Sequence, residues 1–441
     1  MTPAPATDPS APRLTVLGNP GHRRVTLFAA AVRAAGLPEP AVLPWSHVLR
    51  GGYRIEPGTL LRVDSPGEDE TVDRLLRGAA LGPGYAPTRV EGTAAWYAGF
   101  TAALAGVAGA VRAAPGARLL ADPAEIAVMF DKRRTHRLLA GAGVPVPPAL
   151  DQSAGPVSDW ADLKGRLAAA GLRRVFVKPA HGSSASGVLA LEFGPRGRLS
   201  ATTSVSWRDG GLHNSLRVRR YQQEDEIAAI VDRLAPDGLH VERWIPKSAQ
   251  GGRAADLRVV VIAGRATHLV VRTSTGPMTN LHLGGARGDT ELLREAAGPH
   301  WATLLETAER AAACFPGSPA AGVDVLPGAD WRRYLVGEVN AFGDLLPGLT
   351  GLPGGPAEGL DTYAAQLAAV LAGGTELPSV DLPGVDLPGV DLPGVDLPGT
   401  DLPGTDLPGA DLSGPAGGAG PAPAAAHPRT AVPTAGHGAT P

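Results

Sequence analysis

The chain has 441 residues, of which 44% are hydrophobic and 19% are charged, so it is long enough for two or three domains with a sizeable core. Its formal net charge of −3 gives no bulk electrostatic support for nucleic-acid binding. Its single cysteine, Cys314, excludes an internal disulfide and fits a reducing compartment.

Residues 13–115 predict a small N-terminal α/β domain. Residues 13–18 have the apolar pattern of a strand, and a loop and a helix over about residues 23–35 follow. Two further strands are expected at residues 41–43 and 60–63, and Pro66 is expected in the first turn of a second helix. Strands that alternate with helices favour a mainly parallel sheet. The loop after Gly18 is not a GxGxxG fingerprint, so we expect no dinucleotide site there.

The run over residues 92–111 carries no charge and is long enough to span a bilayer. It consists mostly of Ala and Gly, which insert weakly, so we expect a buried helix packed against a sheet. Residues 1–12 are rich in Pro and Ala and lack the apolar core of a signal peptide. We therefore expect a soluble, cytoplasmic protein with no membrane partner.

From residue 116 to residue 372 the pattern changes to longer strands and hairpins mixed with helices. Residues 256–262 and 267–273 flank the sequence Ala-Gly-Arg-Ala, which predicts a hairpin. We expect this second, larger domain to be α+β.

The tail, residues 373–441, contains seven five-residue units between Val380 and Gly414, most of them Val-Asp-Leu-Pro-Gly. Period-five repeats with a hydrophobic centre also occur in right-handed β-helices. Here Pro occupies the same place in six units and removes a backbone donor each time. We therefore expect a disordered tail without a catalytic role.

Two apolar strands near the end of the second domain, residues 321–326 and 335–340, carry three oxygen donors. Glu338 and Asn340 are two residues apart and point to the same face of a strand, and Asp324 can join them from a neighbouring strand. Two carboxylates and an amide oxygen suit Mg²⁺, which usually holds nucleotide phosphates. The alternative is a pair of strands whose polar residues face water.

A strand that ends at Lys178 is followed by a loop of small residues from Gly182 to Gly187. Backbone N–H groups and hydroxyls of such a loop can surround phosphate oxygens, and the lysine adds a point charge. The alternative is a plain hairpin turn, and a Walker A loop is absent. Upstream, Lys132 lies at the start of a helix, where a lysine is normally just solvated.

Residues 241–247 read as a strand that runs into a linker. Such a segment can offer backbone groups to an adenine edge, and charged side chains to a sugar. The alternative is an edge strand with an ordinary aromatic residue.

Taken in order, these motifs resemble the ATP-grasp superfamily, most closely its RimK-type glutamate-ligase and glutathione-synthetase branch. The resemblance covers about residues 119–349, and the N-terminal region resembles the domain that precedes the ATP-grasp domain in this family. It implies an ATP-grasp fold and a ligase that joins a small-molecule or peptide carboxylate to an amine. The reaction would use ATP and Mg²⁺ and pass through an acyl phosphate.

The resemblance also implies roles for individual residues. Lys132 and Lys178 would contact the α- and β-phosphates, and a loop would close over the phosphates. That loop comprises Gly182, Ser183, Ser184, Ser186 and Gly187. The adenine and ribose would be contacted by Glu242, Arg243, Ile245, Lys247 and Asp256, with Arg243 and Ile245 acting mainly through backbone.

At the reacting end, the resemblance implies that Arg258 and Arg272 meet the γ-phosphate and the acyl substrate. Asn280 would lie on the acceptor side. Asp324, Glu338 and Asn340 would hold one or two Mg²⁺ ions, for which Mn²⁺ is a possible substitute.

Two stretches depart from the family pattern. After Asn340 the chain continues Ala-Phe-Gly-Asp-Leu-Leu-Pro, where RimK-type ligases more often have a short Ser/Pro/Gly turn. The substrates therefore stay open, and a non-catalytic ATP-binding partner or regulatory protein is the alternative function. The other stretch, between Gly187 and Glu242, is rich in arginine and could dock an acidic peptide or carrier, with a solvated hairpin as the alternative. Its arginines are Arg196, Arg198, Arg208, Arg217, Arg219 and Arg220.

Overall fold

The computed structural model describes residues 13–78, 85–153, 155–182, 185–343 and 348–372. Contacts group the chain into two units, Met1–Thr405 and Asp406–Pro441, and every described residue belongs to the first. The tail predicted to be disordered, the loop residues Ser183 and Ser184, and residues 344–347 after Asn340 lie outside the described residues.

The N-terminal region forms a four-stranded parallel sheet in the order β2-β1-β3-β4. Its strands are β1 (Arg13–Gly18), β2 (Ala41–Pro44), β3 (Thr59–Val63) and β4 (Arg118–Leu119). The helices of this region are α1 (Arg23–Ala34), α2 (Trp45–Arg50), α3 (Glu70–Arg77) and α4 (Thr93–Ala113). The expected parallel α/β arrangement is confirmed, and the sheet takes its last strand from beyond residue 115.

The helix expected from Pro66 begins later, at Glu70, where Asp69 caps it by accepting from the Val72 N–H at 2.9 Å. The reason is a contact from far along the chain. The Asn19 amide nitrogen donates to the carbonyls of Pro66 and Gly67 at 3.1 and 3.0 Å. This interaction holds residues 66 and 67 in a loop.

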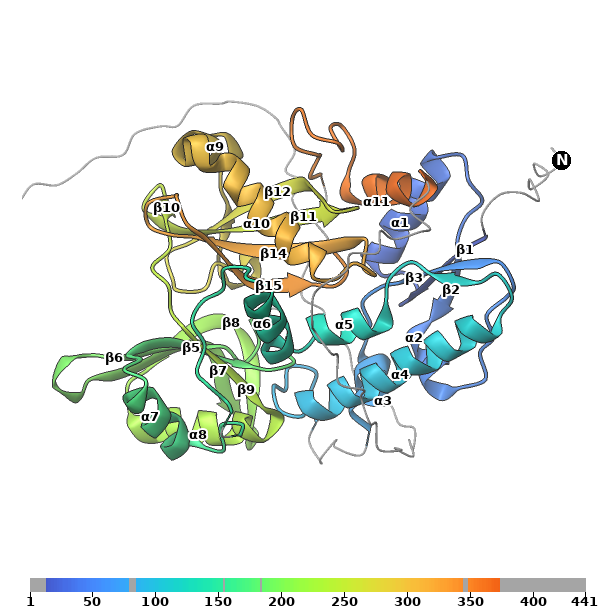
Figure 1. The fold of residues 1–441 in the computed structure, drawn as a ribbon. Coiled ribbons are helices and arrows are strands. Elements are labelled where there is room, and N and C mark those ends of the chain that lie inside the picture. Colours follow the sequence, from blue (N-terminus) through green and yellow to red (C-terminus); the bar gives the residue numbers. More distant parts are fainter. Residues whose placement is uncertain (1–12, 79–84, 154, 183–184, 344–347, 373–441) are drawn as a thin grey trace, which may run out of the picture. The chain divides into compact units, whose positions relative to one another are not determined.

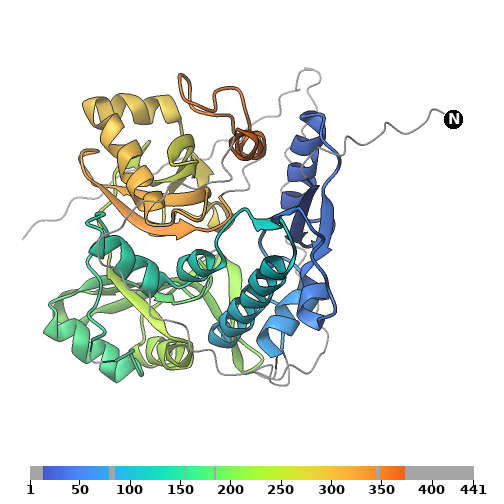
Figure 2. The ribbon, with the colours of Figure 1, turned by 45° about the vertical axis from the view of Figure 1, so that its right-hand side comes forward.

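The next sheet is antiparallel, with the strand order β8-β7-β6-β5-β9. Its strands are β5 (Arg174–Pro179), β6 (Leu189–Phe193), β7 (Leu199–Arg208), β8 (Gly211–Tyr221) and β9 (Leu239–Arg243). Figures 1 and 2 show helices α7 (Trp160–Ala169) and α8 (Glu224–Leu234) on one face of it. Alternate strand residues such as Val175 and Val177 are buried in one core cluster with Leu163 of α7 and Ile230 of α8.

The third sheet is also antiparallel, in the order β13-β12-β11-β14-β15, and β10 pairs with β11. Its strands are β10 (Ala249–Gln250), β11 (Arg253–Ile262), β12 (Arg265–Ser274), β13 (Ala286–Arg287), β14 (Ala320–Pro327) and β15 (Tyr334–Asn340). The predicted hairpin is present: Ala263 and Gly264, both with positive φ, form its two-residue turn. The mixture of antiparallel sheets and helices confirms the α+β expectation for this part of the chain.

One face of this third sheet packs against helix α10 (Trp301–Ala313), as Figure 1 shows. Leu257 of β11 and Val323 of β14 are buried in the same core cluster as Leu304 and Ala308 of α10. The remaining helices are α5 (Pro123–Met129), α6 (Lys132–Gly141), α9 (Thr290–Ala297) and α11 (Thr362–Leu371). Short 3₁₀ turns lie at Pro195–Gly197, Ala235–Asp237, Leu281–Leu283 (η4) and Gly298–His300.

Helix α11 completes the core of the N-terminal region. Tyr363 and Leu367 of α11 share a buried cluster with Phe28 and Val32 of α1 and with Val16 of β1. The last described helix therefore packs against the first one, although more than 300 residues separate them.

Helix α4 is long and apolar enough to cross a membrane by length and composition alone. In the structure Phe100, Leu104, Val107 and Val111 form one stripe along it. This stripe belongs to a core cluster that also contains Leu61 of β3. The stripe thus packs inside the protein, whereas only 22% of the apolar window of α4 is buried, so the helix is less buried than expected.

We predict that Leu304→Ala lowers the free energy of unfolding by about 2–5 kcal/mol, because it removes a fully buried side chain between α10 and the third sheet. Leu292→Ala makes the same change on α9, where the side chain is 53% exposed, and should cost about 0.5 kcal/mol or less. Urea unfolding of both variants measures the difference. Equal losses would contradict this packing.

Candidate active site

The candidate site begins on the face of the third sheet that is turned away from α10. In β14 and β15, Asp324 lies opposite Glu338, and Gly322 lies opposite Asn340. Paired residues of antiparallel strands point to the same face, and so do residues two apart. Asp324, Glu338 and Asn340 therefore share one face, while Val323 and Val339 point into the core on the other.

The same register brings two arginines to this face. Arg258 of β11 lies opposite Asp324, and Arg272 of β12 lies opposite Asp256. Arg258 donates through Nε and Nη2 to both oxygens of Asp324, the Nη2 bond measuring 3.2 Å. Arg272 bridges two carboxylates, at 3.1 Å to Asp324 and 2.8 Å to Asp256. These four residues form a chain of alternating charge.

Burial would raise the pKa of Asp324, but the two arginines outweigh it and hold that pKa far below its usual range. Burial likewise acts to lower the pKa of Arg272, and Asp256 and Asp324 reverse the effect and raise it. Both groups are therefore charged at neutral pH. Because its negative charge persists, Asp324 is suited to binding a cation.

The three oxygen donors, Asp324, Glu338 and Asn340, fit a magnesium ion whose remaining coordination positions are filled by phosphate oxygens. The Asn340 amide nitrogen donates to the Gly322 carbonyl at 3.0 Å, which leaves Oδ1 as its ligating atom. Glu338 is paired with Lys132 at 2.8 Å. Among the described residues no group of three His, Cys, Asp or Glu side chains could hold a metal by itself. Mg²⁺ commonly takes one or two protein carboxylates and fills its other positions from phosphate and water.

The antiparallel sheet that contains β5 and β9 supplies a second charged face. Phe176 lies opposite Glu242 and Lys178 opposite His240, so Lys178 and Glu242 share one face. Lys178 Nζ lies 2.6 Å from Glu242 Oε1, and His240 Nε2 lies 3.0 Å from Glu242 Oε2. Val175 and Val177 point to the opposite face, into the core against α7 and α8.

Charge compensation also governs this face. Burial alone would raise the pKa of Glu242, but Lys178 and His240 outweigh it and lower the pKa to about 2. Burial alone would lower the pKa of Lys178, but Glu242, Glu338 and Asp324 together raise it. Because Glu338 and Asp324 belong to the other sheet, the charged faces of the two sheets act on the same lysine.

Lys132 connects the two sheets directly. It begins α6, whose N-cap Asp131 accepts from the backbone N–H groups of Arg133 and Arg134. The Lys132 backbone N–H donates to the Ala180 carbonyl at 2.9 Å, and its Nζ donates to both the Gly182 carbonyl and Glu338. The lysine therefore lies between the Gly/Ser loop and the three oxygen donors. In the described part of that loop, Gly187 has φ +72° and lies against Pro179 and Val90, where a larger side chain would clash.

The linker after β9 places Lys247 beside Asp256. Lys247 Nζ lies 3.7 Å from Asp256 and donates to Thr279 at 3.0 Å.

The residues expected at the adenine lie in the same linker. Ile245 is half-buried, whereas Arg243 is exposed and its backbone N–H donates to the Pro148 carbonyl at 2.8 Å. That N–H is therefore engaged and could not serve an adenine edge without being released. Asn280 begins the loop that contains η4, and its carbonyl accepts from Leu283 and Gly285.

Several residues that border this site were not identified from the sequence. His240 supports Glu242, and Arg24 of α1 donates to the carbonyl of Phe342, two residues beyond Asn340, at 3.2 Å. Arg24 also lies 3.9 Å from Asp64, a buried carboxylate that follows β3. Asp64 and Asn19 follow neighbouring parallel strands at their carboxyl ends, the usual place of ligands in such sheets. This position at the carboxyl ends of two strands could have identified Asp64 and Asn19 from the sequence.

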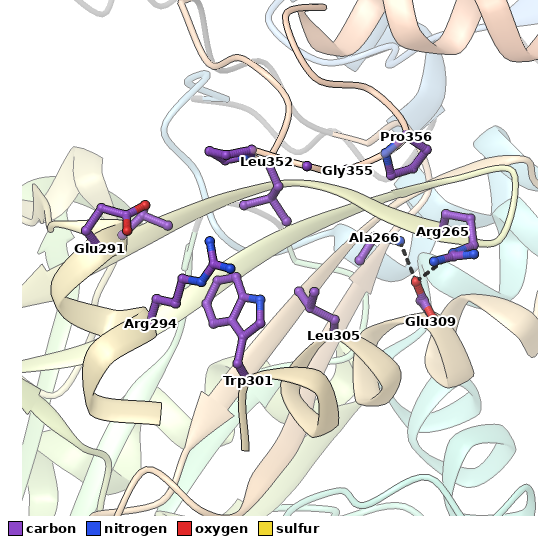
Figure 3. A pocket seen from close by; sticks show the side chains of 13 residues that line it. Arg265, Ala266, Glu291, Arg294, Trp301, Leu305, Glu309, Leu352, Gly355 and Pro356 are labelled. Carbon is purple, nitrogen blue, oxygen red and sulfur yellow. Dashed lines mark hydrogen bonds and ion pairs between the residues drawn. The ribbon is translucent and has the colours of Figure 1, made fainter. Parts of the chain in front are cut away.

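Another cavity, of about 220 Å³, lies between the β11–β12 turn, α9, α10 and residues 352–356. Figure 3 shows Glu309 accepting from Arg265 and from the Ala266 N–H, and Arg294 lying near Trp301. Its lining contains two arginines, two glutamates and no lysine. Because its charges are balanced and it lies away from the three oxygen donors, we place the chemistry at the charged sheet faces.

Comparisons with known proteins give the following matches. A model of pentapeptide repeats matches residues 376–414 in eight copies, one more unit than the seven counted above. No curated protein matches the sequence.

Solved structures similar to this chain include D-cycloserine synthetase DcsG, with 18% identity, TM-score 0.48, and coverage of 81% of this chain and 99% of that one. The ATP-grasp ligase PsnB in complex with its precursor peptide PsnA2 and AMPPNP has 18% identity, TM-score 0.44, and coverage of 83% and 98%. D-alanine–D-alanine ligase from Bacillus anthracis in complex with ATP has 13% identity, TM-score 0.40, and coverage of 82% and 96%.

We predict that Glu242→Gln destabilises the protein by about 3 kcal/mol at pH 7, because Lys178 is then buried without its counter-charge. The folded pKa of Glu242, about 2, lies below its ordinary 4.5, so the stabilisation is present above pH 4.5 and is lost as the pH falls towards 2. Urea unfolding of both proteins between pH 7 and pH 3.5 should show the difference shrinking.

Glu39→Gln is the matched control, because Glu39 forms an exposed pair with Arg33. Its effect should be small at every pH. A Glu242→Gln effect that stays constant down to pH 3.5 would contradict the charge-pair explanation.

Proposed function

We propose that this protein is an ATP-grasp ligase that joins a carboxylate to an amine at the expense of ATP. The observation that carries the proposal is the meeting of Lys132, Lys178, Arg258 and Arg272 with three oxygen donors on two facing charged surfaces. Cations and hard oxygen ligands at one place are what a Mg²⁺–triphosphate requires. The proposal includes the RimK-like branch, which follows from the resemblance of the sequence. It also includes a cytoplasmic location, which fits the single cysteine.

The nucleotide would lie between the two sheets. Lys132 is paired with Glu338 and Lys178 with Glu242, and both lysines would exchange these carboxylates for phosphate oxygens. Lys247 and Asp256, already paired, would meet the ribose. Glu242 would remain near the adenine end, where His240 would still contact it.

Asp324, Glu338 and Asn340 would hold Mg²⁺. When bound, the ion neutralises phosphate charge and polarises the γ-phosphoryl group. Arg258 and Arg272 now pair with Asp324, and they would turn towards the transferring phosphoryl group once that carboxylate binds the ion. Guanidinium groups suit this task because they stay charged and bind oxygens in a bidentate manner.

The reaction would proceed in two steps. A substrate carboxylate oxygen attacks the γ-phosphorus, the bond to the β-phosphate oxygen breaks, and ADP leaves with an acyl phosphate formed. The nitrogen lone pair of an amine then attacks the acyl carbon, phosphate leaves with the bonding electrons, and the nitrogen loses a proton to give an amide. Arg24 and the loop that contains Asn280 border the space where the two organic substrates would meet.

A non-catalytic ATP-binding protein is the second candidate. It is favoured by residues 341–347, which differ from the short turn that RimK-type ligases have next to the substrate. ATP turnover distinguishes the two candidates, because only a ligase releases ADP when its substrates are present.

We expect ADP release when the protein is incubated with ATP, Mg²⁺ and a pool of amino acids and acidic peptides. Added hydroxylamine should capture the acyl phosphate as a hydroxamate, which iron(III) colorimetry or mass spectrometry detects. Tight ATP binding with no ADP release from any pool would favour the non-catalytic candidate.

A second prediction concerns the metal donors. Glu338→Gln should lower kcat about 100-fold and raise the Mg²⁺ concentration needed for half-maximal rate, because it removes a hard ligand. Glu338 is the simpler position to change, since Asp324→Asn would also remove a carboxylate charge that pairs with both Arg258 and Arg272. Magnesium titrations of ADP release provide the measurement.

Asp330→Asn is the control for that titration. Asp330 is an exposed acid in the β14–β15 connection, at 46% side-chain exposure. It should leave the magnesium dependence unchanged, and an equal shift in both variants would remove Glu338 from the metal site.

A further inference from the structure

The second half of strand β8 carries an exposed basic segment, residues 216–220, that the proposed ligase site does not use. All five residues are exposed, and they alternate between aliphatic and cationic for most of their length: Leu216, Arg217, Val218, Arg219 and Arg220. Leu216 and Val218 are 52% and 41% exposed, which is high for aliphatic side chains. Within the described ranges, no carboxylate lies at ion-pair distance from these arginines, and Arg220 Nη2 donates to the Ser200 hydroxyl at 3.2 Å.

This basic segment lies on the open edge of its sheet. The first half of β8 is covered, because the Asn214 N–H donates to the Thr88 carbonyl at 2.7 Å and the Val90 N–H to the Leu212 carbonyl at 2.9 Å. The pairing with β7 then shifts register between Thr203 and Val205, so residues 215–218 leave the regular ladder. Uncovered strand edges with exposed apolar side chains are typical sites of peptide docking.

The segment is also close to the proposed site. Arg220 pairs with Thr202, and the pairing continues through Ala190 to Phe176, so Arg220 lies on the sheet face that carries Lys178. Strand β8 also contacts η4, in the loop that begins at Asn280. A chain bound along the segment would thus border the substrate side of the ligase site.

The chain contains a segment of complementary charge and composition. Residues 373–441 hold seven Asp, one Glu and a single Arg, which is a contribution of −7. Since the whole chain is at −3, the residues before them carry +4. The repeats that match the pentapeptide model combine one acid with one or two aliphatic residues per unit, just as the basic segment combines arginine with Leu216 and Val218.

We propose that residues 376–405 dock on the basic segment of β8 in the same molecule, with repeat aspartates at the arginines and repeat Val and Leu side chains on Leu216 and Val218. Asp401 lies about 30 residues beyond Leu371, so the connecting chain can extend up to roughly 100 Å. A domain of this size is about 50–55 Å across, so the repeats can reach any part of its surface.

Repetition compensates for weak individual contacts. A single exposed ion pair contributes only about 0–1 kcal/mol. Attachment to the same chain raises the effective concentration of the repeats to about the millimolar range, and the repeated units offer equivalent registers. The docking requires neither ATP nor metal, so it stands or falls separately from the ligase proposal.

The test uses the full-length chain in two forms, native and with the eight tail acids replaced by Asn or Gln. A fluorescein-labelled peptide of three Val-Asp-Leu-Pro-Gly units should bind the tail-neutral form, as measured by anisotropy at about 50 mM salt, and should bind about tenfold more weakly at about 500 mM. It should also bind the native form about tenfold more weakly, because the native tail occupies the segment.

Arg217→Glu with Arg219→Glu, made in the tail-neutral form, should weaken the peptide at least about tenfold. Arg23→Glu, the same charge reversal at an exposed arginine on α1, should leave it unchanged. A peptide with Asn for Asp should not bind.

Three results would overturn the proposal: no binding to the tail-neutral form, equal weakening by the two sets of charge reversals, or equal affinity of native and tail-neutral forms. Sedimentation velocity should show the same monomer for both forms. A native dimer that the neutral tail abolishes would place the tail on a second copy and contradict docking within one molecule.

Discussion

The structure depends on the requirement that a buried charge must have a partner. An isolated ion in the protein interior costs several kcal/mol, and the candidate site meets that cost by alternating signs. Asp256, Arg272, Asp324 and Arg258 follow one another across three strands, and Lys178 lies between Glu242 on its own sheet and the acids of the other. A ligand can enter only by exchanging partners, so an incoming phosphate must replace carboxylates, and an incoming metal must replace guanidinium and ammonium groups.

Strand alternation is what permits this arrangement. Each of the two antiparallel sheets places valine and leucine on the side where helices pack, and every second residue faces the charged side. The apolar side chains pack each sheet against its helices and so fix which residues face the charged side. They position the site without belonging to it, whereas Lys132 reaches the site from the start of α6.

Much of this could be predicted from the sequence, because the relevant signals are local. The i, i+2 spacing of Glu338 and Asn340 requires a common face, and the Ala-Gly-Arg-Ala turn between apolar strands predicts its hairpin. Non-local contacts account for what was missed or misplaced. Helix α3 begins at Glu70 because Asn19 binds the preceding loop. The sequence did not indicate Arg24 or His240, because only the strand order and register place them beside Phe342 and Glu242.

The packing of α11 on α1 has a consequence for how the chain is made. Tyr363 and Leu367 fill the same cluster as Phe28 and Val32, so the first strands and helices to leave a ribosome lack part of their core until the last described helix follows. During synthesis, Phe28 and its neighbours must stay exposed to water or find temporary cover. The N-terminal sheet is thus translated well before the helix that completes its core, which makes its exposed apolar face a natural contact for a chaperone.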